Sequence, residues 1–129
     1  MKVGIVIVTH GQTGQSLIDD AEFILSQSLA TVRFVPLNQS SGDSLTVAQL
    51  EQIMADSDSG DGVLVLTDLI GSSPSNLVAA LLPDHHAMMV TGINLAMLIR
   101  VWNYRDKALA SLGKVAIDGG KRGVEAIGP

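Results

Sequence analysis

The sequence contains no cysteine, few aromatic residues and no excess of positive charge. Without cysteine there are no disulfides, thiolate metal sites or thiol nucleophiles, which fits a reducing compartment. One Trp, one Tyr and two Phe indicate a core of aliphatic side chains rather than an aromatic-lined pocket. Eight Lys and Arg residues stand against 13 Asp and Glu, so the formal net charge is −5. Because nucleic acid binding needs a basic surface, we expect no nucleic-acid partner.

Long hydrophobic runs are also lacking, and no segment has the length needed to cross a membrane. The apolar start, residues 1–11, contains a lysine, but His10 and two glycines interrupt it too early for a signal peptide. A chain of 129 residues can bury one sizeable core. We therefore expect a single domain over 1–129 that is cytoplasmic and does not insert into a membrane.

Apolar runs of strand length recur along the chain. Val3–Val8 is a continuous, largely β-branched run, typical of a strand buried on both faces of a parallel sheet. Three further runs predict strands at 31–37, 62–68 and 87–91. Because helical patterns separate these runs, the strands should lie parallel with helices on both faces of the sheet. The predicted fold class is α/β, with a doubly wound, mainly parallel sheet.

The starts of the first three helices are predicted from capping residues. Ser16 with Asp19 forms a capping box for a first helix. Its apolar stripe would be Leu17, Ile18, Ala21, Ile24 and Leu25. Ser44 ends a polar loop over 38–44 and can cap a second helix over 45–55. Ser73 can cap a third, because the following Pro74 is favoured at the first helical position.

Two more helices and a tail complete the predicted order. A fourth helix is expected over 93–105, with Asn94 as its cap, and a fifth over 107–118. Gly119-Gly120 then predicts a helix stop, followed by a short strand-like tail over 123–127.

Candidate functional residues stand where the predicted strands end. The first strand ends in Thr9-His10 and the third in Thr67-Asp68. In open parallel sheets, ligands bind beyond the carboxyl ends of the strands, so these residues become neighbours if the two strands are adjacent. A carboxylate that accepts the Nδ1–H of His10 would fix its tautomer and leave a lone pair on Nε2. That nitrogen could then be a nucleophile, a base or a metal ligand.

The segment after Asp68 adds a candidate anion site. Ser72 and Ser73 supply hydroxyls, and the helix that begins at Pro74 supplies free backbone N–H groups. A nucleophilic imidazole beside an anion site is a pattern suited to accepting a phosphoryl group.

Other functional classes lack their required residues. There is no Gly-x-Ser-x-Gly for a serine hydrolase, and "GQTGQS" has no lysine for a nucleotide-binding loop. A receiver domain would need an acidic pair where His10 stands. His85-His86 resemble a metal-binding pair, but the side chains of adjacent residues point in different directions on most elements. We therefore interpret them as part of a polar loop. We expect neither a metal nor a cofactor.

Three motifs in order resemble a known family. "VTHG" ends the first strand, "TDLIGSSPSN" follows the third, and "VTGINLAML" spans the fourth strand and its helix. Together with the tail "KRGVEAI", they resemble the mannose-family IIA component of the bacterial phosphotransferase system over nearly the whole chain. The resemblance implies that the first and third strands lie side by side. It also implies a homodimer in which a short, antiparallel C-terminal strand is exchanged between subunits.

The same resemblance assigns roles to individual residues. It implies that His10 accepts phosphate on Nε2 from the phosphocarrier HPr and passes it to a IIB component, while Asp68 orients the ring. Ser73 would donate to the phosphoryl group, and Ser72 stands where the family usually has glycine. Ser72 could add a hydroxyl donor or crowd the backbone N–H groups. Apart from the resemblance, the positions of Thr9, Gly71 and Asn94 in the sequence predict that they support the site from around it.

Two alternative functions share this fold. A regulatory phosphorelay protein would keep His10 but report flux to other proteins instead of serving a transporter. The phosphoryl donors of dihydroxyacetone kinases also show Gly-Ser after the acid, but they lack the Ser-Pro-Ser-Asn continuation found here. The sugar-transport branch is therefore favoured.

Overall fold

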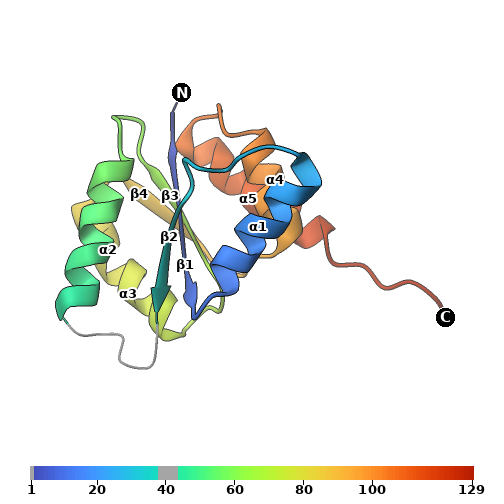
Figure 1. The fold of residues 1–129 in the computed structure, drawn as a ribbon, viewed down its shortest axis with the longest axis horizontal. Coiled ribbons are helices and arrows are strands. Elements are labelled where there is room, and N and C mark those ends of the chain that lie inside the picture. Colours follow the sequence, from blue (N-terminus) through green and yellow to red (C-terminus); the bar gives the residue numbers. More distant parts are fainter. Residues whose placement is uncertain (1, 38–43) are drawn as a thin grey trace.

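A computed structural model describes residues 2–37 and 44–129, so the loop expected at 38–44 lies outside the described residues except for its last residue. That residue, Ser44, was predicted as a cap and is the first residue of a helix. The strands are β1 (Gly4–His10), β2 (Arg33–Leu37), β3 (Val63–Thr67) and β4 (Ala87–Val90). They form one sheet in the order β2-β1-β3-β4, and each pairing is parallel (Figure 1). The four predicted strands and the pairing of the first with the third are confirmed.

Helices cover both faces of the sheet (Figure 1). The helices on one face are α1 (Thr13–Leu25), α4 (Leu95–Asn103) and α5 (Leu109–Arg122). On the other face they are α2 (Ser44–Ser57), α3 (Ser73–Leu81) and the short 3-10 helix η1 (Leu82–Asp84). Strands that alternate with helices on two faces give the doubly wound α/β architecture that the sequence predicts.

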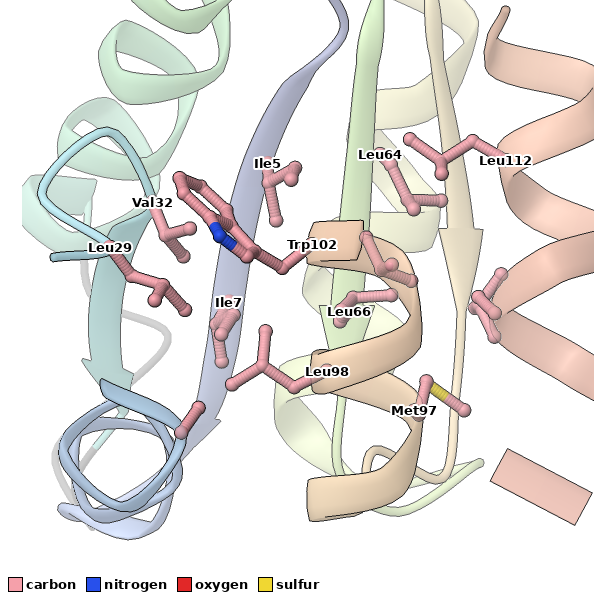
Figure 2. Close-up of a cluster of buried hydrophobic side chains, with 14 of the residues drawn as sticks. Ile5, Ile7, Leu29, Val32, Leu64, Leu66, Met97, Leu98, Trp102 and Leu112 are labelled. Carbon is pink, nitrogen blue, oxygen red and sulfur yellow. The ribbon is translucent and has the colours of Figure 1, made fainter. Parts of the chain in front are cut away.

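Side-chain alternation along the central strands builds two separate cores. Ile5 and Ile7 of β1 pack in the core beneath α1, α4 and α5, as Figure 2 shows around Trp102. Val6 and Val8 pack in the core beneath α2 and α3. A fully buried aliphatic side chain contributes about 1.5–3 kcal/mol relative to an exposed one, so both faces hold β1 in place. The strand that ends in His10 is therefore anchored from two sides.

The predicted start of α1 is wrong by four residues, because the N-cap is Gln12 and not Ser16. The helix begins at Thr13, so Ser16 and Asp19 lie inside it and do not form a capping box. The reason is a tertiary cap, because the Gly14 N–H donates to the buried Thr9 Oγ1 at 2.8 Å. Ile24, expected in the apolar stripe, is 55% exposed.

The predicted helix stop at Gly119-Gly120 is also wrong, since α5 continues to Arg122. These glycines provide room for α4. A Cβ on Gly119 would lie 2.7 Å from the Arg100 Cβ, and one on Gly120 would lie 2.8 Å from the Met97 Cε. After α5, residues 124–129 form neither helix nor strand in the single chain and extend away from the body (Figure 1).

Candidate functional site

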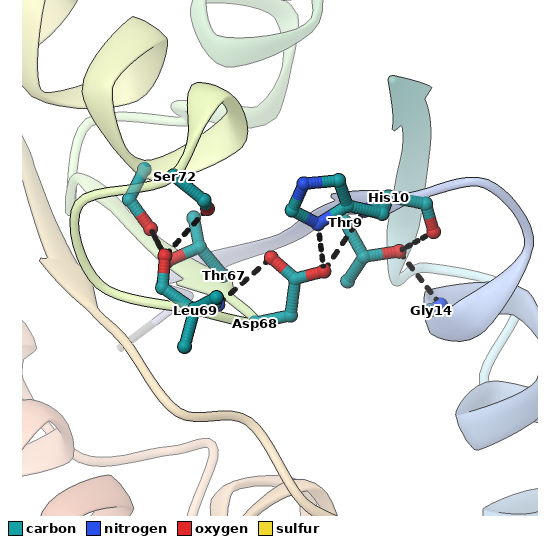
Figure 3. Close-up of polar contacts among 8 residues, drawn as sticks. Thr9, His10, Gly14, Thr67, Asp68, Leu69 and Ser72 are labelled. Carbon is teal, nitrogen blue, oxygen red and sulfur yellow. Dashed lines mark hydrogen bonds and ion pairs between the residues drawn. The ribbon is translucent and has the colours of Figure 1, made fainter. Parts of the chain in front are cut away.

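The candidate site lies at the carboxyl edge of the sheet, where β1 and β3 end side by side. Val8 of β1 is in register with Thr67 of β3, which places His10 and Asp68 just beyond this pair. The His10 Nδ1 lies 2.7 Å from the Asp68 Oδ2, and the His10 backbone N–H donates to the same oxygen at 2.9 Å (Figure 3). The structure therefore brings the two predicted residues into direct contact.

The Asp68 carboxylate is held in its ionised form. Its second oxygen, Oδ1, accepts the Leu69 N–H at 2.9 Å. Partial burial by itself raises the pKa of Asp68, but hydrogen bonds from the His10 backbone and ring and from Leu69 outweigh it. The net result is a pKa for Asp68 below its ordinary value.

This carboxylate selects one tautomer of the His10 ring. An ionised carboxylate only accepts hydrogen bonds, so Nδ1 carries the proton that faces Asp68. The lone pair is then on Nε2, on the side of the ring away from Asp68 (Figure 3). With 53% of the His10 side chain exposed, this nitrogen is open to a second molecule.

Thr9 supports His10 from inside the fold. Its fully buried hydroxyl donates to the His10 carbonyl at 3.1 Å and accepts from the Gly14 N–H at 2.8 Å (Figure 3). One side chain thus ties the end of β1 to the first turn of α1. A supporting role for Thr9 in the chemistry of the site stays a prediction.

In the loop between Asp68 and α3, the Leu69 carbonyl accepts the hydrogen bonds that close the turn. The Ser72 hydroxyl donates to the Leu69 carbonyl, and the Ser72 N–H reaches the same oxygen at 3.2 Å. Gly71 has a φ of +79° with open space around its α-carbon, so the turn needs glycine for its backbone conformation. The Ser72 hydroxyl therefore stabilises the loop, a third arrangement beside the two that the sequence left open.

Two further expected site residues lie at the starts of helices. Ser73 is the exposed first residue of α3, whose N-cap is Ser72, so the prediction that Ser73 caps this helix is wrong. Asn94 caps α4 as expected, because its side chain accepts from the Met97 N–H at 2.8 Å. Its amide donates to the Gly120 carbonyl at 3.1 Å, which directs Asn94 toward α5.

Sequence reasoning missed Ser75. This residue is only 2% exposed, and its hydroxyl donates to the Leu69 carbonyl at 2.7 Å. The available signal was its position, since Ser75 shares the buried side of α3 with Val78. A serine among buried helical positions indicates a polar group with a specific partner.

Over 2–37 and 44–129, no cluster of three His, Cys, Asp or Glu side chains is placed to hold a metal ion. His85 faces Glu51 of α2, with 3.6 Å between Nε2 and Oε1. Within these same ranges, no helix combines the length and the hydrophobicity required to cross a membrane.

Comparison with known families gives a match over most of the chain. Residues 4–116 match the EIIA-man family model, described as the fructose IIA component of the phosphotransferase system. The mannose-specific EIIAB component of Escherichia coli K12 is 30% identical over 132 residues, which cover 98% of this chain. This chain spans about 40% of the length of that curated relative.

Solved structures agree with this match. A mannose/sorbose-specific IIA subunit from Enterococcus faecalis superposes with a TM-score of 0.88 at 26% identity. The superposition covers 100% of this chain and 97% of that subunit. The EIIA component from Streptococcus agalactiae superposes with a TM-score of 0.78 at 24% identity over 96% of each chain, and it supports the fold alone.

Proposed function

Because the chain belongs to the mannose-type IIA family of the bacterial phosphotransferase system, we propose that it carries a phosphoryl group on His10. The group would arrive from phospho-HPr and leave to a IIB component for sugar uptake. The observation that carries this proposal is the 2.7 Å contact between the His10 Nδ1 and the Asp68 Oδ2. The protein would act in the cytoplasm as a phosphotransferase and would need no cofactor.

The chemistry follows from the tautomer. The Nε2 lone pair attacks the phosphorus of phospho-HPr, and the bond between phosphorus and HPr breaks as the new N–P bond forms. The Nδ1 proton stays on His10, in its hydrogen bond to Asp68. The imidazolium charge that develops on phosphorylation is balanced by the Asp68 carboxylate, which already carries its negative charge. In onward transfer, a nucleophile of IIB attacks the phosphorus, and the bond between phosphorus and the His10 Nε2 breaks, which returns the lone pair to Nε2.

The start of α3 would hold the phosphoryl oxygens. The first N–H groups of a helix have no partner within the helix, and its N-terminus favours negative charge. Ser73 lies exposed at this position, so its hydroxyl can turn to the group. Because the Ser72 hydroxyl already donates to the Leu69 carbonyl, we assign phosphoryl contact to Ser73 and loop support to Ser72.

The tail supports a proposal about assembly. Residues 124–129 extend from the body with Val124 75% and Ile127 95% exposed, while β4 has one neighbour in the sheet. An unpaired strand edge favours pairing with another chain. We propose a homodimer in which each tail adds an antiparallel strand to the partner's sheet.

Phosphorylation with purified components tests the carrier function. The chain is incubated with phosphoenolpyruvate, enzyme I and HPr, and intact mass reports the added phosphoryl group. We expect one acid-labile, base-stable group on the wild type and on the control His86→Ala, and none on His10→Ala. A wild type that gains no mass, or a fully labelled His10→Ala variant, would contradict the proposal. Adding a IIB component then distinguishes onward transfer from a purely regulatory role.

A further inference from the structure

The carboxylate that orients His10 is itself held by a loop, and one buried hydroxyl fixes that loop from behind. Ser75 lies in the first turns of α3 and is 2% exposed. Its Oγ donates to the Leu69 carbonyl at 2.7 Å and lies 2.9 Å from the Thr67 Oγ1. It is therefore connected to the residues on both sides of Asp68.

The direction of this hydrogen-bond chain can be worked out from proton counts. A serine hydroxyl has one proton, and a carbonyl oxygen can only accept. The Ser75 proton is therefore used on the Leu69 carbonyl, so the Thr67 hydroxyl must donate to the Ser75 oxygen. The chain runs from Thr67 through Ser75 to Leu69, and each bond in such a chain polarises the next.

Leu69 connects this chain to the carboxylate. While its carbonyl is held by Ser75 and Ser72, its N–H donates to the Asp68 Oδ1 at 2.9 Å. The other carboxylate oxygen, Oδ2, accepts from the His10 ring and backbone. A rotation of the Leu69 backbone would therefore turn the carboxylate and with it the His10 ring.

We propose that Ser75 is a positioning residue for His10. Through the Leu69 carbonyl, it fixes the Asp68 carboxylate in the orientation that favours the His10 tautomer with its proton on Nδ1 and its lone pair on Nε2. The hydrogen bonds of Ser75 go to Thr67 and Leu69, so it acts on His10 through the carboxylate between them. The consequence of this assignment for phosphoryl transfer depends on the proposed carrier function, but the effect on the ring does not.

The test compares Ser75→Ala with a matched serine. Ser57 at the end of α2 also has a buried hydroxyl, and that hydroxyl has no hydrogen-bond partner among the described residues. Ser57 packs against Gly4 at the opposite end of β1 from His10. Ser57→Ala therefore makes the same chemical change without removing a contact to the site.

Nitrogen-15 NMR of the His10 ring is the primary measurement, because it needs no phosphoryl donor. We expect the Nδ1–H tautomer in the wild type and in Ser57→Ala, and a mixture of tautomers in Ser75→Ala. A Ser75→Ala spectrum identical to wild type would overturn the proposal, even if the wild type accepted no phosphate. Should Ser75→Ala fail to fold, Ser75→Cys keeps the size and weakens the donor, and the same comparison decides.

Phosphorylation by phospho-HPr is the second measurement. We expect the rate to fall about fivefold in Ser75→Ala, the effect of losing one buried hydrogen bond. Ser75→Thr, which keeps the hydroxyl, should recover most of that rate, and Ser57→Ala should match the wild type. If Ser75→Ala and Ser75→Thr lost equal rate while both kept the wild-type tautomer, the effect would be one of packing and the assignment would be wrong.

Discussion

At the scale of residues, Asp68 is the group on which the site depends. Its two oxygens accept three hydrogen bonds, two from His10 and one from Leu69. Asparagine at this position keeps one acceptor oxygen and replaces the other with an N–H₂ donor. That donor must face either the Leu69 N–H or the two donors of His10, so one side of the arrangement loses its hydrogen bond.

Asp68→Asn should slow phosphorylation of His10 by about ten- to a hundredfold, the range expected for losing a charge-assisted hydrogen bond. Rapid-quench measurement with phospho-HPr gives the rate. The control is Asp58→Asn, which removes a carboxylate bonded to the Gly60 and Gly62 N–H groups before β3. That variant should transfer phosphate at the wild-type rate. Equal rates for Asp68→Asn and wild type would show that Asp68 does not orient His10.

The same substitution should change the acid dependence of stability. The folded pKa of Asp68 lies below its ordinary value, so ionised Asp68 contributes stability at any pH above the unfolded pKa. This contribution is lost as the pH falls through the lowered folded pKa. Chemical unfolding at a series of acidic pH values should therefore show a smaller loss of stability in Asp68→Asn than in wild type.

How far the sequence predicts these residues depends on what positions them. His10 and Asp68 could be paired in advance, because parallel strands end at one edge of the sheet and the family resemblance implies that the first and third strands are adjacent. The partner of the Ser72 hydroxyl could not, because the Leu69 carbonyl comes within reach only once the turn at Gly71 has formed. Ser75 was missed for a similar reason, since its acceptor is also a backbone atom.

At the scale of elements, strands are predicted better than the ends of helices. Each strand is marked by its own apolar run, whereas the start of α1 is set by Thr9, a residue of the preceding strand. The capping pattern at Ser16 and Asp19 is local in sequence, so it carries no information about this tertiary contact. The glycines of α5 present the same difficulty, because a glycine that ends a helix and one that admits a neighbouring helix look alike in sequence.

Gly119→Ala tests this second interpretation of the α5 glycines. Alanine is intrinsically favoured over glycine inside a helix by about 1 kcal/mol. The new Cβ would, however, lie 2.7 Å from the Arg100 Cβ and 2.9 Å from its Cγ, so α4 and α5 must separate. We expect a net loss of roughly 1–3 kcal/mol in the free energy of unfolding, measured with denaturant. Ser111→Ala, at an exposed position of the same helix, should be neutral or slightly stabilising. A Gly119→Ala variant more stable than wild type would mean that the helices do not approach so closely.

At the scale of the whole molecule, the candidate site and the proposed dimer interface lie on different strands of the sheet. His10 and Asp68 lie at the carboxyl ends of the two central strands, which have neighbours on both sides. The outer strands β2 and β4 each have one neighbour in the described sheet. A partner strand that pairs with β4 would therefore leave β1 and β3 unchanged. Loss of the dimer should for this reason leave the contact between His10 and Asp68 intact.

Removal of the tail tests the exchange. Because α5 continues to Arg122 and its Gly120 carbonyl binds Asn94, the chain should be shortened after Gly123, which removes 124–129 and keeps the helix whole. Light scattering should give the mass of a dimer for the full chain and of a monomer for the shortened one.

The double variant Val124→Asp, Ile127→Asp keeps the length but removes two exposed apolar side chains, and it should weaken the dimer. Glu125→Gln, in the same segment, should not. A shortened chain that stays dimeric would refute the exchange, and a monomeric full chain would refute the dimer. Since the hydrogen bond that orients the His10 ring comes from Asp68 of the same chain, the nitrogen-15 spectrum of the ring should be the same in all of these forms.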